Sequence, residues 1–194
     1  MASDTLDTLF SDLLALQDLS SESLPPVHLW NPKKSGDMDL IIDREGRWIH
    51  EGGVIKRAPL IKLFSQILKF EDGQHYLVTP VEKWRISVEI APFYITLVNR
   101  EIRHQEPAIS CVTSTGETVV VSDENPLWVE HDVETNPPVP LVQIRNGLTG
   151  LWSRAAYYQP VDWAEANWAD NSNELVVTSM GQKFVLGQID SLFR

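Results

Sequence analysis

Apolar residues recur at helical spacing in two segments of the chain. Residues 4–17 carry leucines and one phenylalanine on a single helical face, with Ser3 or Asp4 available as the N-cap. Residues 57–70 repeat apolar positions at i, i+3, i+4, i+7 and i+8, and Pro59 suits the first turn of a helix. The second apolar stripe consists of Leu60, Leu63, Phe64, Ile67 and Leu68. We therefore predict an amphipathic N-terminal helix and a helix over 57–70.

Most of the remaining first half alternates between apolar and polar residues, the pattern of strands. The runs DLIID and GRWIH flank Arg44 and Glu45 and predict a β-hairpin, which the pair Gly52-Gly53 ends. The segment EDGQ predicts a turn. Three further strands are predicted in HYLVTP, EKWRISVEI and FYITLVNREI, separated by Pro80 and Pro92.

The second half is also rich in strands. Its predicted elements are a hairpin over 108–123 with Gly116 at the turn, a proline-rich loop over 133–141, two strands or one bent strand over 141–160, a short capped helix over 162–170, and a hairpin over 174–188. Hairpins favour antiparallel sheets, and no regular βαβ alternation is present.

These elements predict an α+β protein with two antiparallel-sheet units, each carrying one helix. The expected boundaries are 1–36 for the N-terminal helix and a proline-containing strap, 37–104 for the first unit, and 105–194 for the second. The similar lengths and hairpin counts of the units are compatible with a duplicated architecture, although no strict residue repeat relates them.

Composition and charge narrow the classes of partner. The 194 residues are 43% hydrophobic and 22% charged, as in an ordinary globular protein. Sixteen Lys and Arg against 27 Asp and Glu give a net charge of -11, which disfavours nucleic acid and anionic membranes as partners. The N-terminus lacks a secretory leader and no apolar run is long enough to span a bilayer, so a cytoplasmic location is expected.

Standard catalytic and metal motifs are missing from the sequence. No nucleotide-binding glycine motif, zincin motif or paired-cysteine motif occurs, and the five histidines have no close spacing. We therefore predict neither a metal nor a cofactor. The single Cys111 lies in an alternating apolar stretch, where a buried strand cysteine is expected rather than a nucleophile.

Three groups of residues are candidates for a ligand site. In the first, the predicted hairpin places Trp48 and His50 on one strand face, with Glu51 beside the Gly52-Gly53 bend. Such a group can form one wall of a small-molecule site. A core tryptophan with a polar strand edge explains the same residues.

The second group lies on the strand EKWRISVEI. Alternation places Lys83 and Arg85 on the face opposite Trp84, where they can bind an anion such as a carboxylate or phosphate. The alternative is a solvated strand face on which Glu82 and Glu89 neutralise the two cations.

The third group lies in IRNGLTGLWSRAAYY. Arg145 precedes an Asn-Gly turn signal, and Arg154 lies close to Tyr157 in the sequence. Arginine beside aromatic rings suits a ring-bearing anionic ligand through stacking and cation–π contact, whereas a core strand with a solvent-reaching arginine explains the residues equally well.

Several long stretches resemble a known bacterial family. The runs DLIIDREGRWIHEGGVIKR, LVTPVEKWRISVE, IRNGLTGLWSRAAYYQPV and GQKFVLG are similar to the family called domain of unknown function 1285, from about Gly36 onward. The resemblance implies two stacked, related α+β units, the second like a pleckstrin-homology fold. It also implies a nucleotide-like ligand at their interface and a role in signalling. It supplies no catalytic residues, and the N-terminal helix lies outside it.

Three functions follow as hypotheses. The first is a non-enzymatic ligand-binding or sensor protein that holds a small anionic, nucleotide-like ligand between its units. The second is an enzyme that uses His50 and Glu51 as an acid–base pair on a phosphate ester, which requires both side chains to enter one pocket. The third is an interaction protein whose N-terminal helix binds a protein partner or a second copy of the chain.

Overall fold

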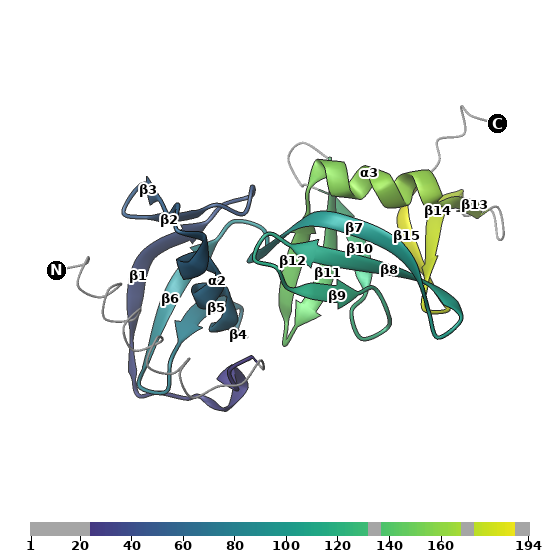
Figure 1. Ribbon diagram of the computed structural model, residues 1–194. Helices are drawn as coiled ribbons and strands as arrows, with labels where there is room; N and C mark the ends of the chain where they lie inside the picture. Colours follow the sequence, from purple (N-terminus) through teal and green to yellow (C-terminus); the bar gives the residue numbers. More distant parts are fainter. Residues whose placement is uncertain (1–23, 132–136, 168–172, 189–194) are drawn as a thin grey trace. The chain divides into compact units, whose positions relative to one another are not determined.

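The computed structural model describes residues 24–131, 137–167 and 173–188 (Figure 1). The fold is α+β, with two six-stranded mixed sheets that each have a helix, and a further three-stranded sheet. The chain divides into two compact units, of which the first contains Arg47–Glu89 and the preceding chain up to Asp43. The second contains the residues from Ile90 onward and the short segment Arg44–Gly46. The predicted N-terminal helix falls outside the described residues.

The sheet of the first unit has the strand order β3-β2-β1-β6-β5-β4. Its strands are β1 (Lys34–Ile42), β2 (Trp48–His50), β3 (Gly53–Val54), β4 (Leu68–Glu71), β5 (Gln74–Val78) and β6 (Glu82–Val88), and the short 3-10 helix η1 (Val27–Leu29) precedes them. The expected β1–β2 hairpin is confirmed, with Ile42 opposite Trp48. The prediction of a purely antiparallel sheet is wrong, because β1 pairs with β6 in parallel. Local turns build the antiparallel pairs, whereas this parallel pair joins strands that a helix and two hairpins separate.

Helix α2 (Ala58–Gln66) is shorter than predicted. Pro59 lies in its first turn, and the whole predicted apolar stripe is buried. The helix nevertheless ends at Gln66, because the following residues form β4 and pair with β5. Asp72 and Gly73 both have positive φ at the β4–β5 turn, the conformation that favours a two-residue hairpin. The hairpin signal therefore prevails over the helical spacing at the end of the stripe.

The sheet of the second unit has the strand order β10-β11-β12-β7-β8-β9 and is curled into a half-barrel. Its strands are β7 (Phe93–Arg103), β8 (Glu106–Thr113), β9 (Thr118–Val120), β10 (Leu127–His131), β11 (Pro138–Arg145) and β12 (Leu148–Trp152). Here too one pair, β12 with β7, is parallel. We placed the boundary between residues 104 and 105, but the structure divides between Glu89 and Ile90. The reason is that β7 pairs with β8 and β12.

Helix α3 (Arg154–Trp163) is a second departure from prediction. The segment 141–160 was predicted as strand throughout, but only β11 and β12 are strands, and the chain then turns into α3. The Ser153 hydroxyl accepts a hydrogen bond from the Ala156 N–H at 3.1 Å and so caps the helix. Of the predicted helix over 162–170, Asp162 and Trp163 are helical as the end of α3, but Glu165–Asn167 forms strand β13.

The three-stranded sheet consists of β13, β14 (Glu174–Ser179) and β15 (Gln182–Gln188). A fully buried serine, Ser179, connects it to the larger sheet. Its hydroxyl accepts from the Ile109 N–H at 2.9 Å and donates to the Val121 carbonyl at 2.6 Å. Helix α3 lies beside β14 and β15 in Figure 1. Residues of α3, β14 and β15 line the pocket of the second unit.

Candidate functional site

The first predicted group is mostly structural. Trp48 is 1% exposed and packs against Phe64 of α2, with 6.2 Å between the ring centroids, so its ring offers no open face for stacking. Glu51 and Gly52 form the two-residue turn between β2 and β3, both with positive φ. His50 Nδ1 lies 3.9 Å from Glu51 Oε2, and neither residue lines the two pockets described below.

Lys83 and Arg85 lie on one face of β6, as alternation predicts, but each has an acidic partner. Lys83 Nζ is 2.5 Å from Glu71 Oε2, and Arg85 Nε is 2.6 Å from Asp37 Oδ1. In the alternative interpretation Glu82 and Glu89 neutralise the two cations, but the partners in the structure are Glu71 and Asp37. Glu82 is buried and pairs with Lys34 at 2.7 Å instead. Asp37 lies on β1, which pairs with β6, and Glu71 lies on β4, on the far side of β5, and the sequence pattern reveals neither arrangement.

The Lys83–Glu71 pair is held inside a small charge cluster. The hydrogen bond from Lys83, and next the one from Lys69, lower the pKa of the Glu71 carboxyl below its ordinary value. The bond to Glu71 raises the pKa of Lys83. Lys83 Nζ also lies 4.6 Å from the centroid of the Tyr76 ring. Because Lys83 already forms an ion pair with Glu71, we assign it a structural role in the first unit rather than a role in ligand binding.

Arg145 is similarly engaged within the second unit. Its Nε donates to Glu117 Oε1 at 2.9 Å, and its guanidinium carbon lies 5.4 Å from the Phe93 ring centroid. The side chain is only 15% exposed. Arg145 is not among the residues that line either described pocket.

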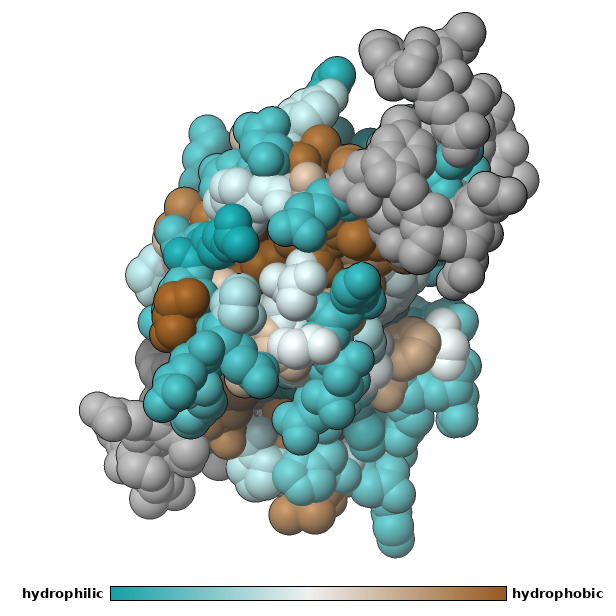
Figure 2. Space-filling view, turned by 90° about the vertical axis from the view of Figure 1, so that its right-hand side faces the viewer, coloured by the Kyte–Doolittle hydropathy of each residue, from teal (hydrophilic) through white to brown (hydrophobic). Residues whose placement is uncertain are grey.

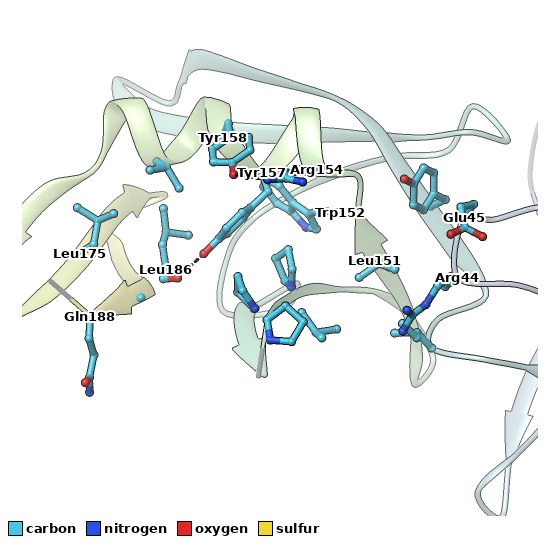
Figure 3. A pocket seen from close by; sticks show the side chains of 18 residues that line it. Arg44, Glu45, Leu151, Trp152, Arg154, Tyr157, Tyr158, Leu175, Leu186 and Gln188 are labelled. Carbon is cyan, nitrogen blue, oxygen red and sulfur yellow. Dashed lines mark hydrogen bonds between the residues drawn. The ribbon is translucent and has the colours of Figure 1, made fainter. Parts of the chain in front are cut away.

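The second unit contains an apolar pocket of about 620 Å³ (Figure 3). Two of the eight predicted site residues, Arg154 and Tyr157, line it. Opposite walls come from the start of β11, with Pro138 and Pro140, and from β15, with Leu186. Arg44 and Glu45 of the segment grouped with this unit also line it. Its size falls in the range of about 300–1,000 Å³ typical of small-molecule sites.

Helix α3 aims a row of side chains at this pocket. Figure 3 shows Tyr157 extending from α3 toward Leu186, whose carbonyl accepts a short hydrogen bond from the tyrosine hydroxyl. Burial, and next the neighbouring Tyr158, raise the pKa of Tyr157, so the phenol stays neutral. The guanidinium of Arg154 lies 5.8 Å from the Tyr158 ring centroid. The pocket therefore combines aromatic walls with two exposed arginines, Arg44 and Arg154, and one exposed carboxylate, Glu45.

Trp152, Tyr158 and the prolines also line the pocket, although none of them is a candidate from the sequence. A usable signal was present, because Arg154, Tyr157 and Tyr158 are spaced i, i+3, i+4 and would share one face of a helix. Assigning 153–160 to a strand hid that face. The prolines were assigned to a loop, although Pro138 and Pro140 belong to β11.

The first unit contains a different, polar pocket of about 590 Å³. Its lining includes Asp37 of β1, Gln74 and His75 of β5, and Arg85 and Ser87 of β6. Burial lowers the pKa of His75, which keeps the imidazole neutral at pH 7. Arg85 is thus the one predicted site residue of the first unit that lines a described pocket.

Other chemistry was sought across the described ranges. Within them, no group of three or more His, Cys, Asp or Glu side chains is arranged to hold a metal ion. Nor does any helix in this part of the chain have the length and apolar character to cross a membrane. Cys111 is fully buried, and burial raises the pKa of its thiol to about 12, as expected for an inert strand cysteine.

The hydropathy of the exposed residues varies over the surface of the second unit. Figure 2 looks from the side of that unit and shows apolar residues gathered in patches between hydrophilic ones. Apolar side chains of this unit that remain exposed include Leu97, Ile102 and Tyr158. Scattered exposure of this kind is normal for a folded protein.

Comparisons with known proteins agree with the fold division. Residues 25–91 match "Domain of unknown function (DUF1285), N-terminal domain", and residues 92–186 match "Protein of unknown function (DUF1285), C-terminal domain". A search of curated proteins found no match.

Two solved structures of DUF1285 family proteins are similar to this chain. One, from Silicibacter pomeroyi DSS-3, is 36% identical over 94% of this chain and 98% of its own, with a TM-score of 0.81. Another, from Shewanella baltica OS155, is 28% identical over 64% of this chain and 91% of its own, with a TM-score of 0.49. The family junction at residues 91 and 92 falls within two residues of the division between the units, and the chain belongs to the DUF1285 family.

Proposed function

We propose that the protein is a non-enzymatic binding or sensor protein for a small, anionic, ring-bearing ligand of the nucleotide type. We place the ligand in the apolar pocket of the second unit. The observation that carries this proposal is the combination of an exposed arginine with aromatic and proline walls around about 620 Å³. A nucleotide presents the matching parts, a planar ring and a phosphate.

The walls favour a ring over a flexible polar chain. Tyr157 and Tyr158 line the pocket with their rings, and Pro138 and Pro140 add rigid apolar surface. Trp152 also lines it but is only 2% exposed. The Tyr157 hydroxyl is already bonded to the Leu186 carbonyl, so the residue contributes its ring rather than a hydrogen bond. Stacking on aromatic faces is tolerant of ring identity and contributes roughly 1–3 kcal/mol per base in nucleic-acid complexes.

Arg154 would bind the anion. Its terminal nitrogen lies 3.4 Å from the Tyr158 hydroxyl, at the long end of hydrogen bonding, and the side chain is on the exposed face of the first turn of α3. A guanidinium has five donors in a planar fork that matches phosphate oxygens. Stacking on Tyr158 orients the fork while leaving most donors available to a ligand.

A sensor role is part of the same proposal. Ligand contacts with α3 would strengthen the attachment of this helix to β15, which now depends on Tyr157. Such a change could be read by a protein partner in bacterial signalling. The pleckstrin-homology-like character of the second unit is supported by its curled sheet and single helix and remains proposed.

Calorimetric titration with matched nucleosides and nucleotides tests the proposal. We expect at least one nucleotide to bind about tenfold or more tightly than its nucleoside, because the phosphate engages Arg154. The variant Arg154→Ala should abolish that difference. Arg103→Ala is the matched control, since Arg103 pairs with Glu101 on β7 and does not line the pocket. The proposal fails if no nucleotide binds, or if Arg154→Ala and Arg103→Ala bind alike.

A further inference from the structure

The polar pocket of the first unit lies where two central strands lose register. In the parallel pair of β1 and β6, Asp37 is opposite Arg85, but Ile41 is opposite Ser87. Three residues of β1, 38–40, therefore face the single residue Ile86 of β6. Bulges of this kind interrupt the ladder, redirect side chains and occur preferentially beside functional sites.

The pocket is built around this irregularity. Asp37 and Met38 line it from β1, and Arg85, Ser87 and Val88 line it from β6, on either side of the register break. The β4–β5 turn and the start of β5 complete it with Gly73, Gln74 and His75. A break in the middle of a sheet thus opens about 590 Å³ among polar side chains.

Arg85 is prepared for an oxyanion in this pocket. Its Nε donates to Asp37 Oδ1 at 2.6 Å, which holds the guanidinium plane. Within the described part of the chain, that is the single hydrogen bond of its side chain, so both terminal nitrogens keep their donors. A carboxylate on the Nε side and a ligand on the terminal fork use different edges of one guanidinium.

Charge and polarity define the ligand class. Asp37 and Arg85 are the charged residues among those that line the pocket, and they cancel, while Gln74 and Ser87 supply neutral hydrogen-bonding groups. A bound monoanion would leave the pocket with one excess negative charge, whereas a dianion would leave two, with no second cation in the lining to offset its repulsion by Asp37. Polar walls favour a hydrophilic molecule, in contrast to the apolar pocket of the second unit.

We propose that this pocket is a second ligand site, which binds the carboxylate of a small hydroxylated monoanion. Arg85 binds the carboxylate, Asp37 positions Arg85, and Gln74 and Ser87 bind hydroxyl groups. The site lies within one unit and does not depend on the nucleotide proposal.

Nuclear magnetic resonance with lactate, gluconate, lactamide and inorganic phosphate as probes tests this site. We expect saturable shifts of the Arg85 Nε–H and Gln74 side-chain amide signals with gluconate or lactate, and none with the neutral lactamide. Arg85→Lys keeps the charge but removes the fork, and should weaken binding about tenfold or more. Arg100→Lys, an exposed arginine on β7, is the matched control.

Two further measurements make the test specific. Asp37→Ala should accelerate exchange of the Arg85 Nε–H with water and weaken gluconate binding, while the rest of the spectrum stays unchanged. If Asp37 served only to stabilise the fold, its loss would instead change signals throughout the first unit. Arg154→Ala should leave the gluconate shifts intact, which separates this site from the nucleotide site. The proposal is overturned if neither acid gives saturable shifts, if Arg85→Lys binds as wild type, or if phosphate binds more tightly than both acids.

Discussion

The buried Ser179 offers a sharp test of how the second unit is held together. The substitution Ser179→Ala removes one hydroxyl that two backbone groups share, the Ile109 N–H at 2.9 Å and the Val121 carbonyl at 2.6 Å. Ser179 is 0% exposed, so water does not reach the site to replace the hydroxyl. Both backbone groups would be left without their partner in a dry environment.

The expected loss follows from those two groups. Leaving one buried donor or acceptor unsatisfied costs about 1–3 kcal/mol, so the loss of both partners in Ser179→Ala should lower the free energy of unfolding by about 2–6 kcal/mol. Because serine and alanine differ by a single oxygen atom, the substitution leaves little empty volume, and we expect only a small cavity contribution to the loss of stability. The loss is a large fraction of the roughly 5–15 kcal/mol that stabilises a typical domain.

Urea denaturation followed by circular dichroism measures the global effect, and hydrogen exchange of the Ile109 amide measures the local one. The matched control is Ser110→Ala. Ser110 lies beside Ile109 on the same strand and is 5% exposed, and its side chain makes no hydrogen bond with the residues that the structure describes. The control should change stability by under about 1 kcal/mol, as deletion of an unbonded hydroxyl usually does. Equal losses in the two variants, or unchanged exchange at Ile109, would refute the reasoning.

Three other predictions concern stability and reactivity. Because the folded pKa of Glu71 is lowered by Lys83, its stabilising contribution is present above the ordinary value of 4.5 and is lost as pH falls through the folded pKa. Wild type should therefore exceed Glu71→Gln in urea stability at pH 7 and converge with it in acid; a constant difference would contradict this. Raising the pKa of Cys111 from 9.0 to about 12 should reduce its thiolate fraction at pH 8 about 1,000-fold, so native protein should react with a disulfide reagent only at its opening rate; rapid labelling would oppose this. Gly36→Ala should lower the free energy of unfolding by about 1–3 kcal/mol in urea melts, because the added Cβ would lie 2.6 Å from the Trp84 ring, and a neutral effect would disprove the clash.

Local patterns were sufficient for most hairpins. Alternation around Asn146-Gly147 indicates strand, turn and strand within a few residues, and Asp72-Gly73 indicates a turn; the structure has positive φ at each of these positions. The β14–β15 hairpin and the buried Cys111 were predicted for the same reason. Interactions between near neighbours decide all of these features.

Patterns failed where two local preferences compete. The helical stripe that begins at Leu60 ends early because β4 gains a strand partner, and strand propensity near Tyr157 gives way to a helix that Ser153 caps. In both places the local pattern is compatible with either structure. Packing against distant strands, rather than propensity, then selects one of them.

Residue types alone indicated where chemistry could occur: an arginine beside tyrosines after β12, and two cations on the face of β6. The pairing of strands far apart in the chain decided which of them can meet a ligand. It pairs Lys83 with Glu71 and leaves the terminal nitrogens of Arg85 available beside a register break. Asp37 lies 48 residues from Arg85 in the sequence. No short-range pattern predicts this ion pair, because the two residues become neighbours only when β1 pairs with β6.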